Sequence, residues 1–426
     1  MRWKSSVLVL TLATVLAGCT VNETLETVDL SQVRDKDDHP LSPKILADMQ
    51  AKGMDRNSPI AIRIFKEEGV LEIWKAKTDN RFEKIKEYAI CAWSGRLGPK
   101  MKEGDRQAPE GFYPLSPQHL NPNSKYYLAI NTGFPNRYDV ANGRNGTNLM
   151  IHGACSSAGC YSMTDEQILE IYAFARDAFK GGQQTIQLQA FPFRMTAENM
   201  ARHRNSPHFE FWQMLKVGYD NFEVTKRPPE VGICGKKYVF NQQVEGGKAM
   251  SAGAACPPMS TPPALEMALN SYNKTYQMAY EKALKKLGDK VWYDPTEAER
   301  KAIVADQRKG HDLAYAPTGS ALKAGKLVSV EDAEKMQLAQ TAAPTSAPAA
   351  IARMAAAKPN QSTPAPATAQ LPQQTAAALS ATTAPQGTPA AVPVPQPNPL
   401  TATANAATAP AQETAQAEKK PFWKFW

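Results

Sequence analysis

One short stretch of the sequence, residues 151–163, contains side chains that could carry out covalent chemistry. Seven residues separate His152 from Cys160, and Gly159 directly precedes the cysteine. A thiol becomes nucleophilic when a nearby base favours its thiolate, and an imidazole titrates close enough to neutral pH to be that base. Gly159 would allow a tight turn whose N–H groups could line an oxyanion hole. The stretch therefore predicts a cysteine nucleophile assisted by a histidine.

A metal site is the alternative interpretation of the same stretch. His152, Cys155 and Cys160 could supply three ligands, with His203 or His208 as a fourth. Zinc ligands usually include pairs at tighter spacing, such as two cysteines separated by two residues. We therefore predict neither a metal nor another cofactor.

The residues before this stretch predict the strands that must position it. Ile60, Ile62 and Ile64 alternate with other residues at the period of a strand, and a second run at 71–74 follows Gly69, which indicates a hairpin. Turn-rich loops separate the runs that follow. Further short strands are expected at 88–93, 111–113, 126–130 and 148–151, which together predict a mostly β domain.

A helix is predicted directly after the cysteine. Thr164 can cap it, and Gln167 three residues later completes a capping-box pattern. The positive end of this helix would favour a thiolate nearby. The helix should stop at Gly181, and a strand is expected at 186–191. The chain is more helical beyond residue 196, most clearly at 263–287, where the predicted apolar stripe is Leu265, Leu269, Tyr272, Tyr276, Ala279 and Ala283.

The N-terminal residues predict that the protein is exported. Arg2 and Lys4 precede an apolar run at 7–16 that is too short for a permanent membrane span. Small residues then lead to Cys19, an order that resembles a bacterial lipobox, although an ordinary signal peptide is the alternative. A lipidated Cys19 would anchor the chain to a membrane leaflet. Thr20 favours the outer membrane, so we expect a periplasm-facing, outer-membrane lipoprotein.

Composition limits the foldable part of the 426 residues. From about 341 to 414 the chain is almost entirely Ala, Pro, Thr, Gln and Ser, a composition typical of a disordered linker. Aromatic residues beside lysines at 419–426 suit a membrane interface or a partner groove. The formal charge of +8 suits anionic polymers, but no basic block with interleaved aromatics in the foldable part indicates nucleic-acid binding.

Four of the six cysteines remain if Cys19 is lipidated and Cys160 is the nucleophile. Four cysteines allow three pairings, and an oxidising periplasm permits disulfides. The local pairing would be Cys234 with Cys256, and the longer-range one Cys91 with Cys155.

The residues His152-Gly153 and Ser157-Ala158-Gly159-Cys160 resemble the active-site motif of the L,D-transpeptidase family, which has a YkuD-type catalytic domain. A longer likeness, to the YafK-type (DpaA) branch, covers about 58–229 and does not extend beyond Gly232. Its blocks include Leu97-Gly98-Pro99-Lys100, Pro109-Glu110-Gly111-Phe112-Tyr113, Phe134-Pro135-Asn136 and Pro192-Phe193-Arg194-Met195-Thr196.

The resemblance implies a YkuD-like β-sandwich with a capping helix, with Cys160 as nucleophile and His152 as base. Gly153, Ser157 and Gly159 would shape the loop and its oxyanion site. The family's substrates are peptidoglycan stem peptides, in which the cysteine attacks the carbonyl on the L-centre of meso-diaminopimelate. An amine or water then resolves the thioester.

Four further side chains could bind substrate carboxylates through charge-assisted or neutral hydrogen bonds. They are Arg194, Lys100, Arg137 and Tyr138. Fixing a loop or the surface is the alternative role for each of them.

Two departures from the family motif leave the reaction open. Ala158 stands where the family has a second histidine, and Ser162 stands where it usually has an arginine. YafK-type relatives are linked to hydrolysis of the bond between peptidoglycan and a Braun-type lipoprotein. Transfer and hydrolysis therefore both remain, and a non-catalytic, wall-binding lipoprotein that tethers envelope layers is an alternative of another class.

The predicted organisation has seven parts. They are a lipoprotein signal peptide (1–19), a tether (20–57), the catalytic domain (58–195), a helical segment shared with the family (196–231), a helical extension (232–338), a disordered linker (339–415) and a basic aromatic tail (416–426).

Overall fold

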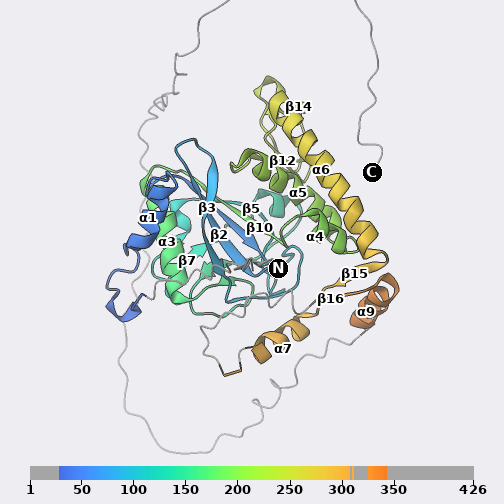
Figure 1. Cartoon of the computed structure of the whole chain (residues 1–426), viewed down its shortest axis with the longest axis horizontal. Helices are drawn as coiled ribbons and strands as arrows, with labels where there is room; N and C mark the ends of the chain where they lie inside the picture. Colours follow the sequence, from blue (N-terminus) through green and yellow to red (C-terminus); the bar gives the residue numbers. More distant parts are fainter. Residues whose placement is uncertain (1–27, 308, 311–324, 343–426) are drawn as a thin grey trace, which may run out of the picture. The chain divides into compact units, whose positions relative to one another are not determined.

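The computed structural model describes residues 28–307, 309–310 and 325–342 (Figure 1). The predicted signal peptide with Cys19, nearly all of the predicted linker and the aromatic tail lie outside these residues. Within the described ranges, no helix has both the length and the apolar composition needed to cross a membrane. The two residues with predicted chemistry, His152 and Cys160, lie inside them.

The first of two large sheets consists of long, buried strands. The alternating isoleucines form β1 (Ile60–Phe65), which pairs antiparallel with β2 (Val70–Ala76) across the predicted hairpin turn. β10 (Ile186–Phe191) lies parallel to β1 on its other side. Every side chain of β1 is buried, so this sheet is the framework of the domain. Its strand order is β3-β2-β1-β10-β5, with β3 at Phe82–Ala89 and β5 at Gly111–Leu115.

The second large sheet consists of much shorter strands. β8 (Met150–His152) lies parallel to β9 (Tyr161–Ser162), and the register pairs Ile151 with Tyr161 and His152 with Ser162. Parallel neighbours usually need a connection of a dozen or more residues. The shorter loop 153–160 is enough here because both strands are so short. The order is β4-β9-β8-β7-β6, with β4 at Ala92–Trp93, β7 at Ala129–Asn131 and β6 at Leu120–Asn121.

The main core is shared by both sheets and the helix α3 (Asp165–Lys180). The predicted capping box is present: the N–H of Gln167 donates to Thr164 Oγ1, and the N–H of Thr164 donates to Gln167 Oε1. Ile168 and Ile171 of this helix are fully buried. The fold is therefore the expected mostly β domain covered by a helix.

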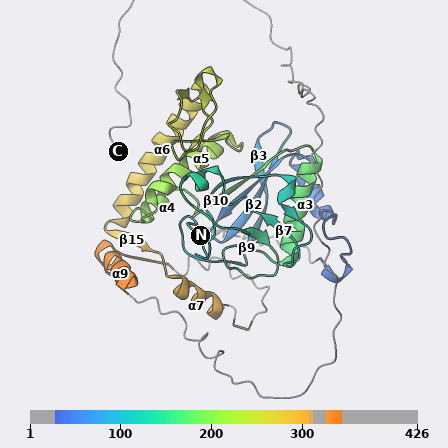
Figure 2. The same ribbon diagram turned by 180° about the vertical axis from the view of Figure 1, so that it is seen from behind.

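The segment before β1 belongs to the folded domain. The helix α1 (Pro43–Ala51) buries Ile45 and Met49 in the main core, and Figures 1 and 2 show it beside α3. Leu41 and Met54 are buried in the same core. The prediction of a tether over 20–57 is therefore wrong from 41 to 54, because these four apolar side chains hold the segment against the domain.

Two strand boundaries differ from the prediction. The strand expected at 88–93 is split, because the chain leaves the first sheet after Ala89 and enters the second at Ala92. The N–H of Cys91, at the break, donates to Ser162 O. The strand expected at 126–130 begins only at Ala129, because Tyr127 has a left-handed backbone with φ of 68°.

The residues after β10 form a second layer of helices. α4 (Ala197–Arg202) and α5 (Phe209–Thr225) cover a second core cluster, and α6 (Pro263–Leu287) packs along both (Figures 1 and 2). The predicted helical extension also contains three two-stranded sheets. Its further elements are β11 (Val231–Cys234), β12 (Lys237–Phe240), β13 (Gln243–Val244), β14 (Met259–Ser260), β15 (Lys290–Tyr293), α7 (Glu297–Gln307), β16 (Lys326–Ser329) and α9 (Val330–Ala342). The short helical turns are η1 (Leu30–Gln32), η2 (Pro117–His119), α2 (Arg137–Ala141) and η3 (Glu245–Gly247).

The apolar stripe of α6 lies largely where it was predicted. Tyr272 and Tyr276 are partly buried, and Ala283 is buried. Ala279 was expected on the stripe but is exposed, and Tyr280 packs in its place. The helical period of 3.6 residues explains the difference, because it brings residue 280 back over residue 276.

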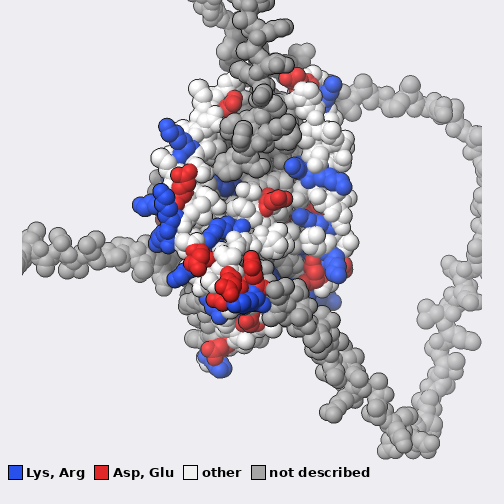
Figure 3. All heavy atoms as spheres, turned by 90° about the vertical axis from the view of Figure 1, so that its right-hand side faces the viewer, with Lys and Arg blue, Asp and Glu red and all other residues white. Residues whose placement is uncertain are grey.

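Charged side chains of both signs share the surface. On the face shown in Figure 3, Lys and Arg are interspersed with Asp and Glu. One exposed pair joins Lys286 of α6 to Glu198 of α4, with 3.3 Å between Nζ and Oε1. The net positive charge of the chain therefore does not gather into one basic patch on this face.

Candidate active site

His152 ends β8 and is almost completely buried, with 2% of its surface exposed. Its Nδ1 lies 2.5 Å from the carbonyl oxygen of Gly153. A carbonyl can only accept, so Nδ1 carries the proton and Nε2 keeps its lone pair. Burial lowers the pKa of His152, which favours the neutral ring. The imidazole is therefore held in the tautomer that can accept a proton at Nε2.

The pocket around His152 leaves no space for a side chain at position 153. The ring of Tyr126 lies over the imidazole, with 4.5 Å between centroids. The N–H of Gly153 donates to Tyr126 O, and a Cβ at position 153 would collide with the carboxylate of Asp165 and lie 2.9 Å from Tyr126 O. Asp165 instead accepts the N–H of Ala154 at 2.8 Å. Gly153 is thus required by the close approach of these neighbours.

Cys160 lies just before β9, where the ladder with β8 places it opposite Met150. Ile151 and Tyr161, the neighbouring pair, are fully buried in the core. Successive side chains of a strand point to opposite faces. Cys160 and His152 therefore share the face of the sheet that points away from this core.

Burial favours the protonated form of the Cys160 thiol. Burial raises its pKa, while the N–H of Met150, 3.4 Å from Sγ, and the positive charge of Lys100 act in the opposite direction. Sγ also lies 3.6 Å from the carbonyl oxygen of Asn148, which can accept the thiol proton in a hydrogen bond. Burial thus acts on both groups in the same sense, toward a neutral Cys160 thiol and a neutral His152 ring.

Ser157 and Gly159 shape the loop that returns to Cys160. Ser157 Oγ donates to the carbonyl oxygen of Cys160 at 2.7 Å and accepts the N–H of Gly159 at 3.3 Å. Gly159 has a φ of 127°, and a Cβ there would lie 3.2 Å from Leu149. Because the N–H of Gly159 is already bound by Ser157, this donor is engaged within the loop rather than directed at a developing oxyanion.

A disulfide joins the loop to the strand beside it. Cys91 is bonded to Cys155, and Cys234 to Cys256, which is the pairing favoured by the sequence. Cys160 is the free cysteine of the described residues. Cys155 therefore cannot act as a thiolate ligand. In the described ranges no group of three or more His, Cys, Asp or Glu side chains could hold a metal ion, and His203 contacts Glu67 instead.

Of the four predicted substrate-binding side chains, Lys100 is the one whose charge reaches the thiol. It is 3% exposed, and its Nζ lies 2.5 Å from Asp105 and donates to the carbonyl oxygen of Lys102. Its ion pair with Asp105 holds the loop after Pro99. The structure thus places Lys100 as a buried loop-fixing residue whose field also acts on Cys160.

Arg194 and Tyr138 make their contacts in other places. Arg194 pairs with Glu72 at 2.8 Å and Glu87 at 3.3 Å in the first sheet. Tyr138 is buried, with its ring stacked 4.2 Å from that of Tyr238. These contacts are those of structural residues.

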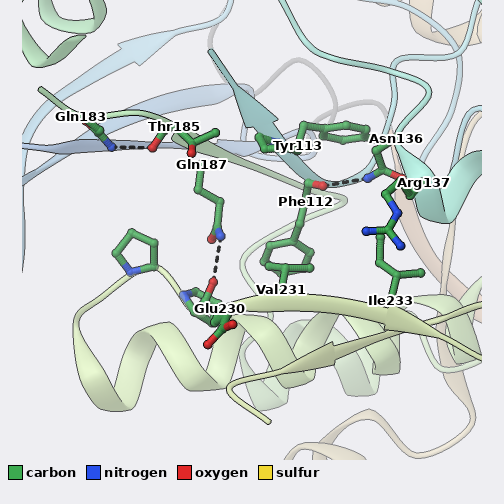
Figure 4. Close-up of a pocket in the computed structure, with 13 residues that line it drawn as sticks. Phe112, Tyr113, Asn136, Arg137, Gln183, Thr185, Gln187, Glu230, Val231 and Ile233 are labelled. Atoms are coloured by element: carbon green, nitrogen blue, oxygen red, sulfur yellow. Dashed lines mark hydrogen bonds between the residues drawn. The ribbon is translucent and has the colours of Figure 1, made fainter. Parts of the chain in front are cut away.

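Arg137 lines a pocket of about 490 Å³ between β5 and β11 (Figure 4). Its guanidinium donates to the carbonyl oxygen of Met250 at 3.1 Å. Figure 4 shows Gln187 bridging the same pocket toward Pro229. Neither Cys160 nor His152 lines this pocket, so Arg137 is not brought to the thiol.

The sequence interpretation missed residues that contact the site from other loops. Tyr126 covers the imidazole, and the hydroxyl of Ser94 lies 3.4 Å from that of Ser157. Gln107 is also close, because its carbonyl oxygen would lie 3.6 Å from a Cβ at Gly159. No local pattern distinguishes these residues from ordinary loop residues, so only their tertiary position identifies them.

Two comparisons of sequence reach known proteins. A family model of the L,D-transpeptidase catalytic domain (YkuD) matches residues 62–185, which include His152 and Cys160. YafK of Escherichia coli strain K12, which carries the provisional name of an L,D-transpeptidase, is 48% identical over 185 residues. That alignment covers 43% of this chain and 75% of YafK. YafK of Escherichia coli O157:H7 matches equally well.

Two solved structures are similar at low sequence identity. The helical cell shape determining protein Pgp2 of Campylobacter jejuni is 16% identical, with 59% of this chain and 80% of that chain covered and a TM-score of 0.26. Bd1075 of Bdellovibrio bacteriovorus is 18% identical, with 41% and 76% covered and a TM-score of 0.24. Scores this low support no inference about function.

Proposed function

Because the chain belongs to the L,D-transpeptidase (YkuD) family, we propose that it modifies peptidoglycan stem peptides through a thioester on Cys160. The family assigns the broad class, a catalytic domain with a peptidoglycan-related function. The attack at meso-diaminopimelate and the roles of the two residues are the finer parts of the proposal.

The observation that carries the proposal is the joint placement of His152 and Cys160. The parallel register of β8 and β9 brings the end of β8, which carries His152, beside the strand that follows Cys160, and the contact of Nδ1 with the carbonyl of Gly153 supports a tautomer whose Nε2 can accept a proton. A neutral thiol beside a neutral imidazole needs proton transfer to occur during attack, which is general-base catalysis.

The reaction then follows in two balanced steps. Cys160 Sγ forms a bond to the carbonyl carbon on the L-centre of meso-diaminopimelate, and its proton passes to His152 Nε2. The imidazolium returns that proton to the departing amine as the C–N bond breaks, leaving a thioester. An amine or water next attacks the thioester, gives its proton to His152, and restores the thiol as the C–S bond breaks.

The identity of the second nucleophile separates a transpeptidase from an amidase that releases a peptidoglycan-bound lipoprotein. Ala158 is exposed and has no polar group to orient an acceptor. Ser162 is buried and donates to Ala92 O at 2.8 Å, so it binds the neighbouring strand rather than substrate. The two positions at which this chain departs from the family motif thus offer no acceptor-binding group, which favours water as an acceptor.

We also propose that the chain is exported and anchored through a lipidated Cys19 at the outer membrane. The order of charge, apolar run and small residues before Cys19 supports this. The two disulfides support an oxidising compartment such as the periplasm.

Mass spectrometry of reaction products tests the proposal. The full chain and its Cys160→Ala variant would be incubated in detergent with sacculi that do or do not carry covalently attached lipoprotein. Ser156→Ala, an exposed position on the same loop, is the matched control.

Lipoprotein released without new cross-links, by the full chain and the control only, would establish the amidase. New diaminopimelate cross-links or D-amino-acid exchange would establish the transpeptidase. Equal products from the Cys160→Ala variant, or no product from either substrate, would reject the enzyme in favour of a wall-binding module.

A further inference from the structure

A segment of the C-terminal extension, residues 290–300, lies against the loop that leads away from β4. We call residues 290–300 the strap; it comprises β15 and the start of α7, both visible in Figures 1 and 2. The strap begins more than one hundred residues after the end of the YkuD match at residue 185. The strap therefore lies outside the matched family domain, and the C-terminal extension makes its contacts with the catalytic domain.

Two charged residues of the strap bind the backbone of the loop 93–97. Arg300 is 4% exposed, and its Nε donates to Gly95 O at 3.2 Å. Asp294 accepts the N–H of Leu97 at 3.3 Å through Oδ2. The two residues also bind each other, with 2.9 Å between Arg300 Nη2 and Asp294 Oδ1. Lys66 and Gln107 of the catalytic domain also bind main-chain groups of this loop, so the strap adds to the contacts that hold its backbone.

The same loop is continuous with the nucleophile. Trp93 pairs with Tyr161, which directly follows Cys160, and the guanidinium of Arg300 lies 4.6 Å from the centre of the Trp93 ring. Ser94, the next residue, lies 3.4 Å from Ser157 between the hydroxyl oxygens, and Ser157 donates to the carbonyl oxygen of Cys160. A displacement of residues 93–95 would therefore move both sides of the Cys160 loop.

Removing a guanidinium from water is unfavourable unless its N–H groups find hydrogen-bond acceptors. Packing alone therefore does not explain the burial of Arg300. Arg300 Nη1 is buried without a hydrogen-bond partner among the described residues. Asp294 also pairs with the side chain of Arg96, with 3.3 Å between Oδ2 and Nε, so the strap binds both backbone and side-chain groups of the loop.

We propose that Arg300 and Asp294 are positioning residues, which hold the loop 93–97 and, through Ser94 and Ser157, keep Cys160 in its reactive geometry. The effect on turnover rests on the proposed function. The effect on the reactivity of the thiol does not, because it can be measured without a substrate.

The test compares full-length variants in the presence of both disulfides. Arg300→Met removes the donors and the charge, Arg300→Lys keeps the charge with different geometry, and Asp294→Asn is the mildest change. Lys286→Ala, which breaks an exposed ion pair in the same extension, is the matched control. Iodoacetamide modification of the Cys160 peptide would be followed across pH by mass spectrometry, alongside kcat, KM and the thermal unfolding midpoint.

We expect Arg300→Met to change the pH profile of Cys160 modification and to lower kcat by about tenfold or more with little change in KM, since small displacements of reacting groups have effects of this size. Arg300→Lys should restore part of both, and Lys286→Ala should alter neither. Folded Arg300 and Asp294 variants with the parent profile and parent kcat would overturn the proposal. If Arg300→Met does not fold, Arg300→Lys and Asp294→Asn decide the outcome. If the parent has no turnover, an altered modification profile still supports positioning and an unaltered one rejects it.

Discussion

In the first sheet β1 extends over six residues and buries every side chain, whereas in the second sheet β9 extends over two. The long strands have extensive ladders and a shared core, so pairing itself determines their positions. The short strand β8 ends at His152 and β9 begins just after Cys160, and both have few ladder hydrogen bonds. Their geometry depends on a disulfide, on Ser157 and on the strap. Of these two sheets, the one with the shorter ladders therefore carries the residues proposed to act in the reaction, and tertiary contacts hold them.

The largest expected effect is a loss of turnover without a loss of stability when His152 is replaced. His152→Gln keeps a side chain of similar size but removes the proton acceptor, so turnover should fall by roughly 10²- to 10⁴-fold. The thermal unfolding midpoint should change little, because the first sheet is untouched. Product analysis and calorimetry on the same sample would measure both. If turnover is lost only when the variant also fails to fold, His152 acts by stabilising the fold.

Next in size is the loss of one disulfide. Replacing Cys91 and Cys155 by serine should reduce the free energy of unfolding by about 2–5 kcal/mol. It should also speed amide exchange over residues 153–163 and lower turnover, because this bond holds the nucleophile loop. Cys234→Ser with Cys256→Ser is the matched control in the extension and should leave that exchange unchanged. Equal exchange in both variants would contradict the comparison between the sheets.

A smaller expected effect is on the pH dependence of stability, through a carboxyl group at the β1–β2 turn of the first sheet. Burial raises the pKa of Glu68, in the β1–β2 turn, to about 7 from 4.5. The folded state therefore binds more protons at this group than the unfolded state does, so the contribution of Glu68 to stability is greatest below pH 4.5 and is lost as the pH rises through 7. The contribution is at most about 3 kcal/mol. Glu68→Gln should flatten this part of a denaturant-unfolding series; an unchanged slope would contradict the assignment.

The smallest expected effect distinguishes a neutral Cys160 thiol from a preformed pair of thiolate and imidazolium. Because burial raises the pKa of Cys160 above its ordinary value of 9.0, modification by iodoacetamide should still increase with pH above 9. The neutral His152 is consistent with this. Peptide-resolved mass spectrometry across pH would measure the rate. A plateau near neutral pH would instead indicate a preformed thiolate and imidazolium.

Local patterns predicted the elements whose causes are local. The alternating isoleucines predicted β1, and the pair Thr164 and Gln167 predicted the start of α3. These successes share a reason, which is that side-chain period and capping act within a few residues.

Contacts between distant residues decided the rest. The segment with Ile45 and Met49 looked like a tether because its few apolar residues gain burial only against α3 and the first sheet. The sequence allows Arg194 to bind substrate, but in the structure its guanidinium pairs with Glu72 and Glu87. Such pairings join residues far apart in the chain, so no local period encodes them.

The sequence by itself determined the family, the candidate nucleophile and base, and the long elements, because these depend on residue types at short spacing. Only the tertiary structure decided the hydrogen bond that orients the His152 ring, the burial that raises the pKa of Cys160 and the contact of the strap with the loop 93–97. Burial and the partners brought by folding determine proton positions and loop geometry, and both are properties of the assembled site.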